Sequence, residues 1–334
     1  MIVVHKNTKI YAMCPAATFT GGPELLHQLV NKMTLAGYEA YMVYSGDAEN
    51  PVHPNFVIYN NKYTTEIEDN PENILIVPEI YITKVGHLTQ IRKCVWWLSI
   101  DNFFKPYFTY PAFWMFKMLK QIGLEGMCKE LIFKLKVSDK FQYHIVQSYY
   151  AKMFLKQHKI ESEPLYDYLS AAFLQNSTGI DLSAKKPQVL YNPKKGFEFT
   201  AKLIEQGKDI NWIPLEGMKP AEVVALLKES MVYIDFGTHP GRDRFPREAA
   251  ILQCCVITGK RGSANYYEDV PITDQYKIED KVSNIPHIIN TIRACMSDFH
   301  THIQAFESYR QMILSAEKMY MESFNRIFEQ TPSE

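Results

Sequence analysis

Residues 231–272 read MVYIDFGTHPGRDRFPREAAILQCCVITGKRGSANYYEDVPI, and this stretch indicates the class of fold. It opens and closes on apolar runs, residues 232–236 and 254–258, which are typical of buried strands. Between them we expect a polar loop at residues 237–244 and a short helix starting near Pro246. Strand, loop, helix and strand form one repeat of a parallel α/β sheet. Ligands of such sheets bind beyond the carboxyl ends of the strands, where this loop lies.

The loop concentrates groups that bind anions. His239, Arg242, Asp243 and Arg244 lie within eight residues, and Gly241 lets the backbone bend between them. Arginine suits phosphate oxygens because its guanidinium presents several N–H donors in one plane. The sequence therefore predicts an anion site at this edge of the sheet.

Length and composition limit the classes of protein. The 334 residues suit two domains better than one core. A net charge of −1 argues against nucleic acid as a partner. The six cysteines form no CxxC pair and no cluster with metal-ligand spacing, so no metal site is expected. Four of them lie in or beside apolar runs, which predicts buried free thiols and a reducing compartment: Cys14, Cys94, Cys254 and Cys255. The sequence shows neither the apolar core of a signal peptide nor a run of about 18 apolar residues that would span a membrane.

Short apolar runs separated by helical patterns predict a parallel α/β arrangement in the N-terminal half. The expected strands are residues 9–15, 38–44, 55–59, 74–77, 94–100 and 144–147. Gly21 and Gly22 precede a helix expected over residues 24–36, and they fit either an anion at its N-terminus or a tight turn. Asp101, at the end of a predicted strand, fits either a general base or the cap of the next turn.

The segment from Phe103 to Lys140 interleaves lysines with aromatic and aliphatic residues. This composition suits a helical segment on an anionic membrane surface, and equally an acceptor-binding flap. An amphipathic helix pair packed on the domain, with its lysines in solvent, explains the same pattern. Between these readings the composition favours the packed helix pair over membrane contact.

The C-terminal half repeats the alternation. After a connecting helix at residues 166–173, which ends the N-terminal half, we expect strands at residues 188–191, 212–215, 232–236 and 254–258, and helices at residues 197–205, 220–230, 283–296 and 299–328. Lys194 and Lys195 follow the first of these strands, so in a parallel sheet they converge with Arg242 and Arg244 on one point that suits a diphosphate. Glu248, expected in the first turn of the helix after Pro246, fits either a sugar hydroxyl or a favourable charge at a helix N-terminus.

These motifs carry a family resemblance. The segments YNPKKG (residues 191–196), YIDF (233–236), PREAA (246–250) and VITG (256–259) resemble the donor-binding half of GT-B glycosyltransferases, in particular bacterial enzymes of surface-polysaccharide assembly such as capsule or O-antigen. The loop and helix at residues 18–29 resemble the N-terminal glycine loop of that fold. The resemblance implies an α/β protein with two Rossmann-like domains facing across a cleft and a C-terminal helix crossing back to the N-terminal domain. The implied divisions are an acceptor domain (1–180), a donor domain (181–310) and a crossover helix with tail (311–334).

The resemblance also implies roles for individual residues. Lys194 and Lys195 would hold the diphosphate of a nucleotide-sugar and Glu248 its ribose, with no metal and no cofactor needed. The expected donor-binding residues are Gly21, Gly22, Asn192, Lys194, Lys195, His239, Gly241, Arg242, Asp243 and Glu248. In the familiar retaining pattern two glutamates flank seven residues, whereas here Pro240 stands eight positions before Glu248. Asp243 either orients sugar hydroxyls in place of the missing glutamate or pairs with an arginine.

The expected function is transfer of a sugar, from a UDP-sugar by default, to a hydroxyl of a glycan or lipid-linked acceptor in bacterial polysaccharide assembly. Arg244 would assist departure of the nucleotide. If the enzyme inverts, a base from the N-terminal half is needed, first Asp101 and then His144. A cytoplasmic protein is expected, at the inner face of the membrane if residues 103–140 touch lipid. A nucleotide-sugar 2-epimerase and a non-catalytic GT-B-like scaffold remain as alternatives.

Overall fold

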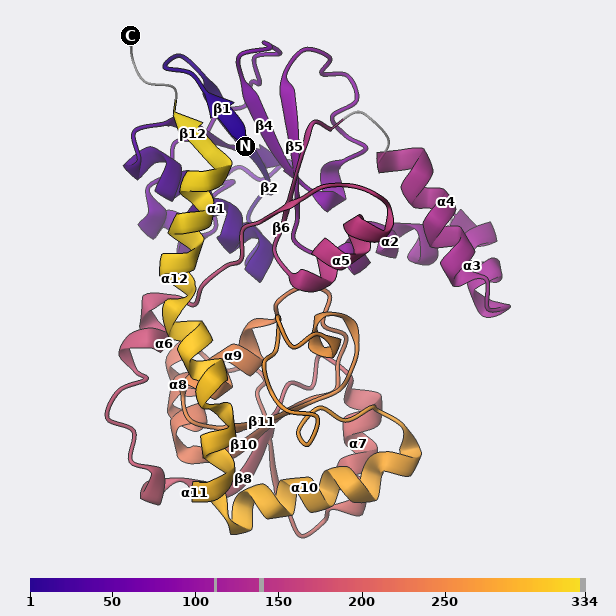
Figure 1. Cartoon of the computed structure of the whole chain (residues 1–334), viewed down its shortest axis with the longest axis vertical. Coiled ribbons are helices and arrows are strands. Elements are labelled where there is room, and N and C mark those ends of the chain that lie inside the picture. Colours follow the sequence, from indigo (N-terminus) through magenta and orange to yellow (C-terminus); the bar gives the residue numbers. More distant parts are fainter. Residues whose placement is uncertain (111–112, 138–140, 331–334) are drawn as a thin grey trace. The chain divides into compact units, whose positions relative to one another are not determined.

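The computed structural model describes residues 1–110, 113–137 and 141–330, and the chain divides into two compact units. The first unit comprises Met1–Gln147, Ala151–Leu165 and the chain from Glu322. The second comprises Ser148–Tyr150 and Tyr166–Met321. Each unit has its own parallel sheet, as the alternation of short apolar runs and helical patterns predicts (Figure 1).

The first unit is built on a six-stranded parallel sheet with the order β3-β2-β4-β5-β6-β7. Its strands are β2 (Lys9–Pro15), β3 (Glu39–Ser45), β4 (Ile74–Pro78), β5 (Arg92–Trp97), β6 (Tyr143–Val146) and β7 (Glu163–Pro164). Every residue of β4 is buried, which is why that strand is a continuous apolar run rather than an alternating one.

Helices and 3-10 turns connect these strands. They are α1 (Gly21–Leu35), η1 (Pro54–Tyr59), η2 (Glu79–Tyr81), α2 (Ile100–Thr109), α3 (Trp114–Gln121), α4 (Glu125–Val137) and α5 (Tyr149–Gln157). In α1 the apolar residues Leu25, Leu26, Leu29 and Met33 recur at helical spacing and are fully or almost fully buried.

The end of the chain belongs to the first unit. Strand β12 (Phe328–Gln330) pairs in parallel with β1 (Ile2–Val4), with Ile2 opposite Phe328. The hydroxyl of Tyr38 also donates to the Phe328 carbonyl, at 3.1 Å. The expected return of the C-terminal helix to the N-terminal domain is therefore confirmed.

The second unit contains a four-stranded parallel sheet with the order β11-β10-β8-β9. Its strands are β8 (Lys186–Tyr191), β9 (Asn211–Pro214), β10 (Ser230–Asp235) and β11 (Cys255–Thr258). The register places Tyr191 opposite Ile234, and Asp235 opposite Thr258. The carboxyl ends of β8, β10 and β11 are thus level, and the loops that follow them share one edge of the sheet.

The helices of this unit cover a core of aliphatic and aromatic side chains from the sheet. They are α6 (Ala171–Gln175), η4 (Leu182–Ala184), α7 (Phe197–Gln206), α8 (Pro220–Glu229), α9 (Arg244–Ile251), η5 (Gly262–Asn265), η6 (Val282–Asn284), α10 (Ile285–Ser297), α11 (Phe299–His302), η7 (Ile303–Phe306) and α12 (Glu307–Ile327). Among the described helices, none has both the length and the apolar content needed to cross a bilayer. All six cysteines are buried and free, which includes the four for which burial was expected, Cys14, Cys94, Cys254 and Cys255.

Three local expectations are wrong. Residues 55–59 form the 3-10 helix η1 instead of a strand, because Pro54 fits its first turn and the His53 ring accepts from the Asn55 N–H. The connecting helix expected at residues 166–173 is only Ala171–Gln175. The long helix expected over residues 299–328 is divided into α11, η7 and α12.

Two loops at the carboxyl edge of the second sheet approach each other so closely that glycine is required. Gly196 has a φ of +63°, and a Cβ added there would lie 2.5 Å from the Phe236 carbonyl oxygen. A Cβ on Gly237 would lie 2.7 Å from the Cβ of Lys195. The loop after β8 and the loop after β10 therefore pack backbone against backbone.

Replacing Gly196 with alanine is expected to lower the free energy of unfolding by about 3 kcal/mol or more, because steric overlap adds to the strain of a left-handed backbone. Gly37→Ala is the matched control, since Gly37 has a φ of +87° but open space around it. Gly37→Ala should lower the free energy of unfolding by about 1 kcal/mol, because it strains the left-handed backbone without any steric overlap. Equal losses for the two variants in chemical denaturation would contradict the close packing of the two loops.

Candidate functional site

The loop after β10 is held by a row of alternating charges. The Lys195 ammonium is 2.8 Å from Oδ2 of Asp243. The same oxygen is 3.2 Å from Nδ1 of His239, whose Nε2 is 3.4 Å from Oδ1 of Asp235. Asp235 also accepts from the Gly237 N–H and the Tyr233 hydroxyl. The loops after β8 and β10 are therefore joined by charge as well as by backbone packing.

Burial and charge act in opposite directions on this row. Burial alone would lower the pKa of His239, but Asp235 and Asp243 outweigh it and raise the pKa above 6.5. Burial would raise the pKa of Asp235, but His239 and the Gly237 N–H bring it below its ordinary value. The pKa of Asp243 is raised by its burial, which His239 and Lys195 only partly offset. A protonated His239 between the two carboxyl groups fits these directions.

Asp235, His239 and Asp243 also offer ligand atoms within 4.8 Å of one another, a spacing that a divalent metal ion could use. Asp243 already has a cation beside it, the Lys195 ammonium. A metal ion would have to displace this ammonium and the proton that favours His239 between the carboxyl groups.

Arg247 anchors the other side of the loop. Its guanidinium is buried and donates to the carbonyl oxygens of Arg242, at 2.8 Å, and Asp243, at 3.2 Å. It also pairs with the buried carboxylate of Asp167 at 2.7 Å. The sequence reasoning missed Arg247. A signal was present, because Arg247 lies one helical turn before the apolar Ile251, on the face of α9 that packs inward.

The two arginines expected to bind a diphosphate have different surroundings. Arg242 is buried, with its guanidinium 5.0 Å from the centre of the Tyr166 ring and its Nε 3.8 Å from Asp269. Asp269 also accepts from the backbone N–H groups of Tyr149 and Tyr150. Arg244 is the first residue of α9 and is half-buried. The Nε of Arg244 is nevertheless buried, and its charge is one of those that lower the pKa of the buried Asp167, after the larger effects of burial and of Arg247. What distinguishes Arg242 is that Asp269 and the ring of Tyr166 face it.

The remaining donor residues expected in this unit lie around the same edge. Lys194 is exposed, and its N–H donates to the Asn192 side chain at 3.0 Å. The Gly241 carbonyl accepts from the Ser263 hydroxyl at 2.6 Å. Glu248 is buried and is the fifth residue of α9, so it lies in the second turn and not in the first, because the helix begins two residues before Pro246.

The glycines expected at the N-terminal anion site lie in the first unit. Gly21 and Gly22 are the first two residues of α1, and neither has a positive φ. The two glycines therefore do not form a tight turn of the kind that requires glycine. A Cβ on Gly22 would lie 3.4 Å from the end of the Leu98 side chain, an ordinary van der Waals distance, so the packing there does not require glycine.

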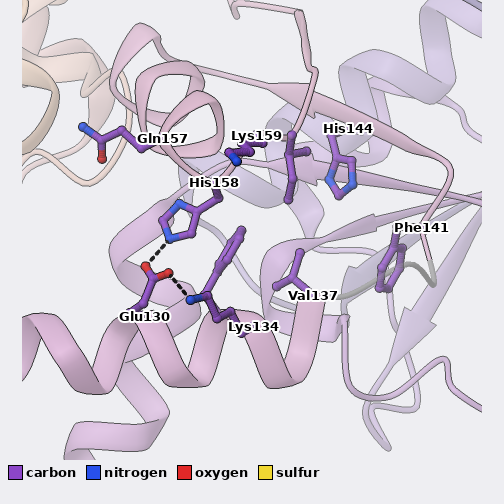
Figure 2. A pocket seen from close by; sticks show the side chains of 10 residues that line it. Glu130, Lys134, Val137, Phe141, His144, Gln157, His158 and Lys159 are labelled. Carbon is purple, nitrogen blue, oxygen red and sulfur yellow. Dashed lines mark hydrogen bonds and ion pairs between the residues drawn. The ribbon is translucent and has the colours of Figure 1, made fainter.

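The two expected bases also lie in the first unit. Asp101 is half-buried in the first turn of α2, beyond the end of β5, and Ser99 caps this helix by accepting from the Asn102 N–H. His144 lines a cavity of about 630 Å³ between α4, β6 and α5 (Figure 2). Nδ1 of His144 accepts from the Trp97 indole at 3.1 Å, and burial lowers the pKa of His144 to about 4. Its neutral ring therefore carries the proton on Nε2 and offers a donor in place of a basic lone pair.

Glu79 is a carboxyl group that the sequence reasoning left without a role. It directly follows β4 and lines a second cavity of about 610 Å³ in the first unit, together with Asn102 and Lys105. Burial raises the pKa of Glu79 to about 7, although its carboxylate accepts from the Leu98 N–H at 3.0 Å. A carboxyl group that titrates near neutrality beside a cavity has the properties of a general base. The position of Glu79 directly after a predicted apolar strand could have indicated it as a candidate base.

Solved structures of low sequence identity share the fold of this chain. Sucrose-phosphate synthase from Thermosynechococcus elongatus has a TM-score of 0.66 at 11% identity, covering 96% of this chain and 98% of that one. HepE from Anabaena, solved with UDP and glucose, has a TM-score of 0.62 at 10% identity, covering 96% and 99%. A glycosyltransferase from Rickettsia africae has a TM-score of 0.58 at 11% identity, with the same coverage as HepE. The predicted GT-B fold is therefore confirmed. No protein-family model and no curated protein matches the sequence.

Replacing the buried Arg242 with alanine is expected to lower the free energy of unfolding by about 3 kcal/mol, because Asp269 then loses the charge that faces it. Chemical denaturation measures this. Arg293→Ala is the control, because Arg293 is exposed and its ion pair with Asp209 lies in solvent. A small and equal effect for both would mean that Arg242 is not part of the buried framework of the loop.

Glu79→Gln is expected to change the pH dependence of stability. The unfolded carboxyl titrates near 4.5 and the folded one near 7, so unfolding releases a proton between these values. The contribution of the Glu79 carboxyl group to the free energy of unfolding is complete below pH 4.5, and it falls by about 3 kcal/mol as the pH rises through 7. Glutamine can still accept from Leu98 but does not titrate. The variant should therefore gain stability over the parent at pH 8 and lose that advantage towards pH 5, as measured by chemical denaturation at both pH values. An equal difference at the two pH values would contradict the raised pKa of Glu79.

Proposed function

We propose that this chain is a glycosyltransferase that moves a sugar from a nucleotide-diphosphate sugar to an acceptor hydroxyl in bacterial glycan or polysaccharide assembly. One observation carries the proposal. In a GT-B fold, the N-termini of α7 and α9 lie along the carboxyl edge of one parallel sheet, with Lys194 and Lys195 in the loop after β8 and Arg244 in the first turn of α9. Helix N-termini and cationic side chains at such an edge favour a diphosphate.

The proposed donor site lies in the second unit. Lys194 and Lys195 would neutralise the diphosphate, and Arg244 would stabilise the charge that develops on it as the sugar departs. Glu248 would accept from the ribose hydroxyls. Arg242 is proposed here as a support of the loop and not as a ligand, because its guanidinium faces Tyr166 and Asp269.

UDP is the proposed nucleotide, and the structure of HepE with UDP and glucose supports a nucleotide of this kind. The proposed mechanism uses neither a metal ion nor a cofactor, since cations of the chain take that role. For an inverting reaction Glu79 joins Asp101 as a candidate base, on the basis of its cavity and its pKa near 7. A retaining reaction needs no such base. The acceptor would be a glycan or a lipid-linked sugar at the cytoplasmic face of a membrane.

A thermal-shift screen against UDP, GDP, CMP and their sugars tests the donor. A nucleotide at 100 times its Kd should stabilise the protein by about 2.7 kcal/mol, which is visible as a rise in Tm. Incubation with the preferred donor alone then separates two chemistries, because an epimerase converts the sugar without an acceptor. Binding without turnover on any acceptor would favour a non-catalytic scaffold.

Lys195→Ala is expected to raise the Kd for the preferred nucleoside diphosphate about tenfold or more, because it removes a charge-assisted hydrogen bond of roughly 2 kcal/mol. Isothermal titration calorimetry measures this. Lys186→Ala is the matched control, since Lys186 is the first residue of β8, the strand that the Lys195 loop follows, and it is exposed and pairs with Glu229. An unchanged Kd for Lys195→Ala, with a circular dichroism spectrum like that of the parent, would contradict the assignment of the donor site.

A further inference from the structure

Helices α3 and α4 expose an unusual amount of apolar surface. Of the 21 large hydrophobic side chains that the described part of the chain exposes, nine lie between residues 110 and 135. They are Tyr110, Trp114, Met115, Met118, Ile122, Leu124, Met127, Leu131 and Leu135. Figure 1 shows α3 and α4 as a pair that projects from one side of the first unit. We call residues 114–137 the α3–α4 surface.

The exposed residues form ordered stripes. Trp114, Met118 and Ile122 are four residues apart, so they lie on one face of α3 and its C-terminal turn. None of the residues of α3 is buried. Single exposed hydrophobic residues are ordinary on protein surfaces, but a row of them along a helix is not.

Helix α4 repeats the arrangement with Met127, Leu131 and Leu135. The six residues of the two stripes are between 51% and 70% exposed. The opposite face of α4 is already used, since Cys128, Ile132, Phe133 and Val137 are buried against the unit. Packing within the first unit therefore accounts for one apolar face of α4 and leaves the other uncovered.

The charges around the stripes are positive. The α3–α4 surface contains five lysines and two glutamates. Both glutamates are already paired, Glu125 with Lys120 and Lys129, and Glu130 with Lys134 and His158 (Figure 2). Lys117 and Lys136 are exposed beside the stripes. The surface thus presents long apolar side chains bordered by cations, with its acidic groups neutralised.

We propose that the α3–α4 surface docks on the surface of a bilayer that contains anionic phospholipid. Apolar side chains would enter the boundary between headgroups and acyl chains, and lysines would lie against lipid phosphates. Trp114 suits such an interface because the indole has an apolar ring and a polar N–H. A protein partner would need a groove that fits two stripes at once, whereas a lipid surface accommodates both. The proposal does not rest on sugar transfer, but it gives the enzyme direct access to a lipid-linked acceptor.

Flotation of the full chain with vesicles tests this docking. We expect binding to phosphatidylcholine vesicles that contain phosphatidylglycerol, weaker binding to phosphatidylcholine alone, and a decrease as salt rises. Trp114 fluorescence should shift to the blue on binding, because Trp96 and Trp97 are already buried and the half-buried Trp212 donates its indole N–H to the Gly207 carbonyl in the second unit. The shift should be lost in Trp114→Phe. Absence of binding to the anionic vesicles would overturn the proposal.

Variants then locate the surface. Met127→Ser with Leu131→Ser should lower the partition coefficient about tenfold or more, because two apolar side chains are removed. Lys117→Glu with Lys136→Glu should lower it about fivefold or more per charge. The matched control is Leu314→Ser with Met319→Ser, two equally exposed residues of α12. The control should bind as the parent does. Binding equal to the parent's by the Met127/Leu131 and Lys117/Lys136 variants would contradict the proposal, and so would self-association of the lipid-free protein through the stripes, measured by light scattering.

Discussion

The row of charges formed by Lys195, Asp243, His239 and Asp235 is the constraint on which the candidate donor site depends. Each member has a neighbour of opposite charge, so burial of His239 between two carboxyl groups is tolerable. The row crosses from the loop after β8 to the loop after β10, where the two backbones already touch at Gly196 and Gly237. Both loops are therefore set in one shape before any ligand binds. Such preorganisation reduces the entropy that binding has to overcome.

Most strands of the two sheets could be predicted because burial on both faces requires continuous apolar runs, and the loops at their carboxyl ends followed directly. Strand β7 was missed because its two residues are too few to form such a run, and residues 55–59, which were expected as a strand, form η1 instead. The direction of each charged side chain could not. Arg242 and Arg244 are two residues apart and chemically identical, yet it is Arg242 that faces Asp269 and the ring of Tyr166. Asp269 and Tyr166 are distant from the loop in sequence, so the sequence of the loop does not indicate which arginine they contact.

Helix boundaries limited the prediction in a similar way. Placing the start of α9 at Pro246 put Glu248 in the first turn, whereas the helix begins at Arg244 and puts it one turn later. For the α3–α4 surface, composition favoured an amphipathic pair packed on the domain. The structure shows both packing and exposure, because α4 is apolar on two faces and only one meets the unit. A count of apolar residues does not distinguish these cases, since it does not say how many faces the domain can cover.

The same row of charges bears on the place where this sequence departs from the familiar retaining pattern. Pro240 replaces a glutamate, and the nearest carboxyl group on the loop is Asp243, which shares its oxygen between Lys195 and His239. A diphosphate that attracts Lys195 would leave Asp243 with His239 alone. The carboxyl group would then lose one positive neighbour, and its pKa, already raised by burial, would rise further. If the proposed donor site holds the diphosphate through Lys195, donor binding and the protonation of Asp243 would therefore be coupled through this one lysine.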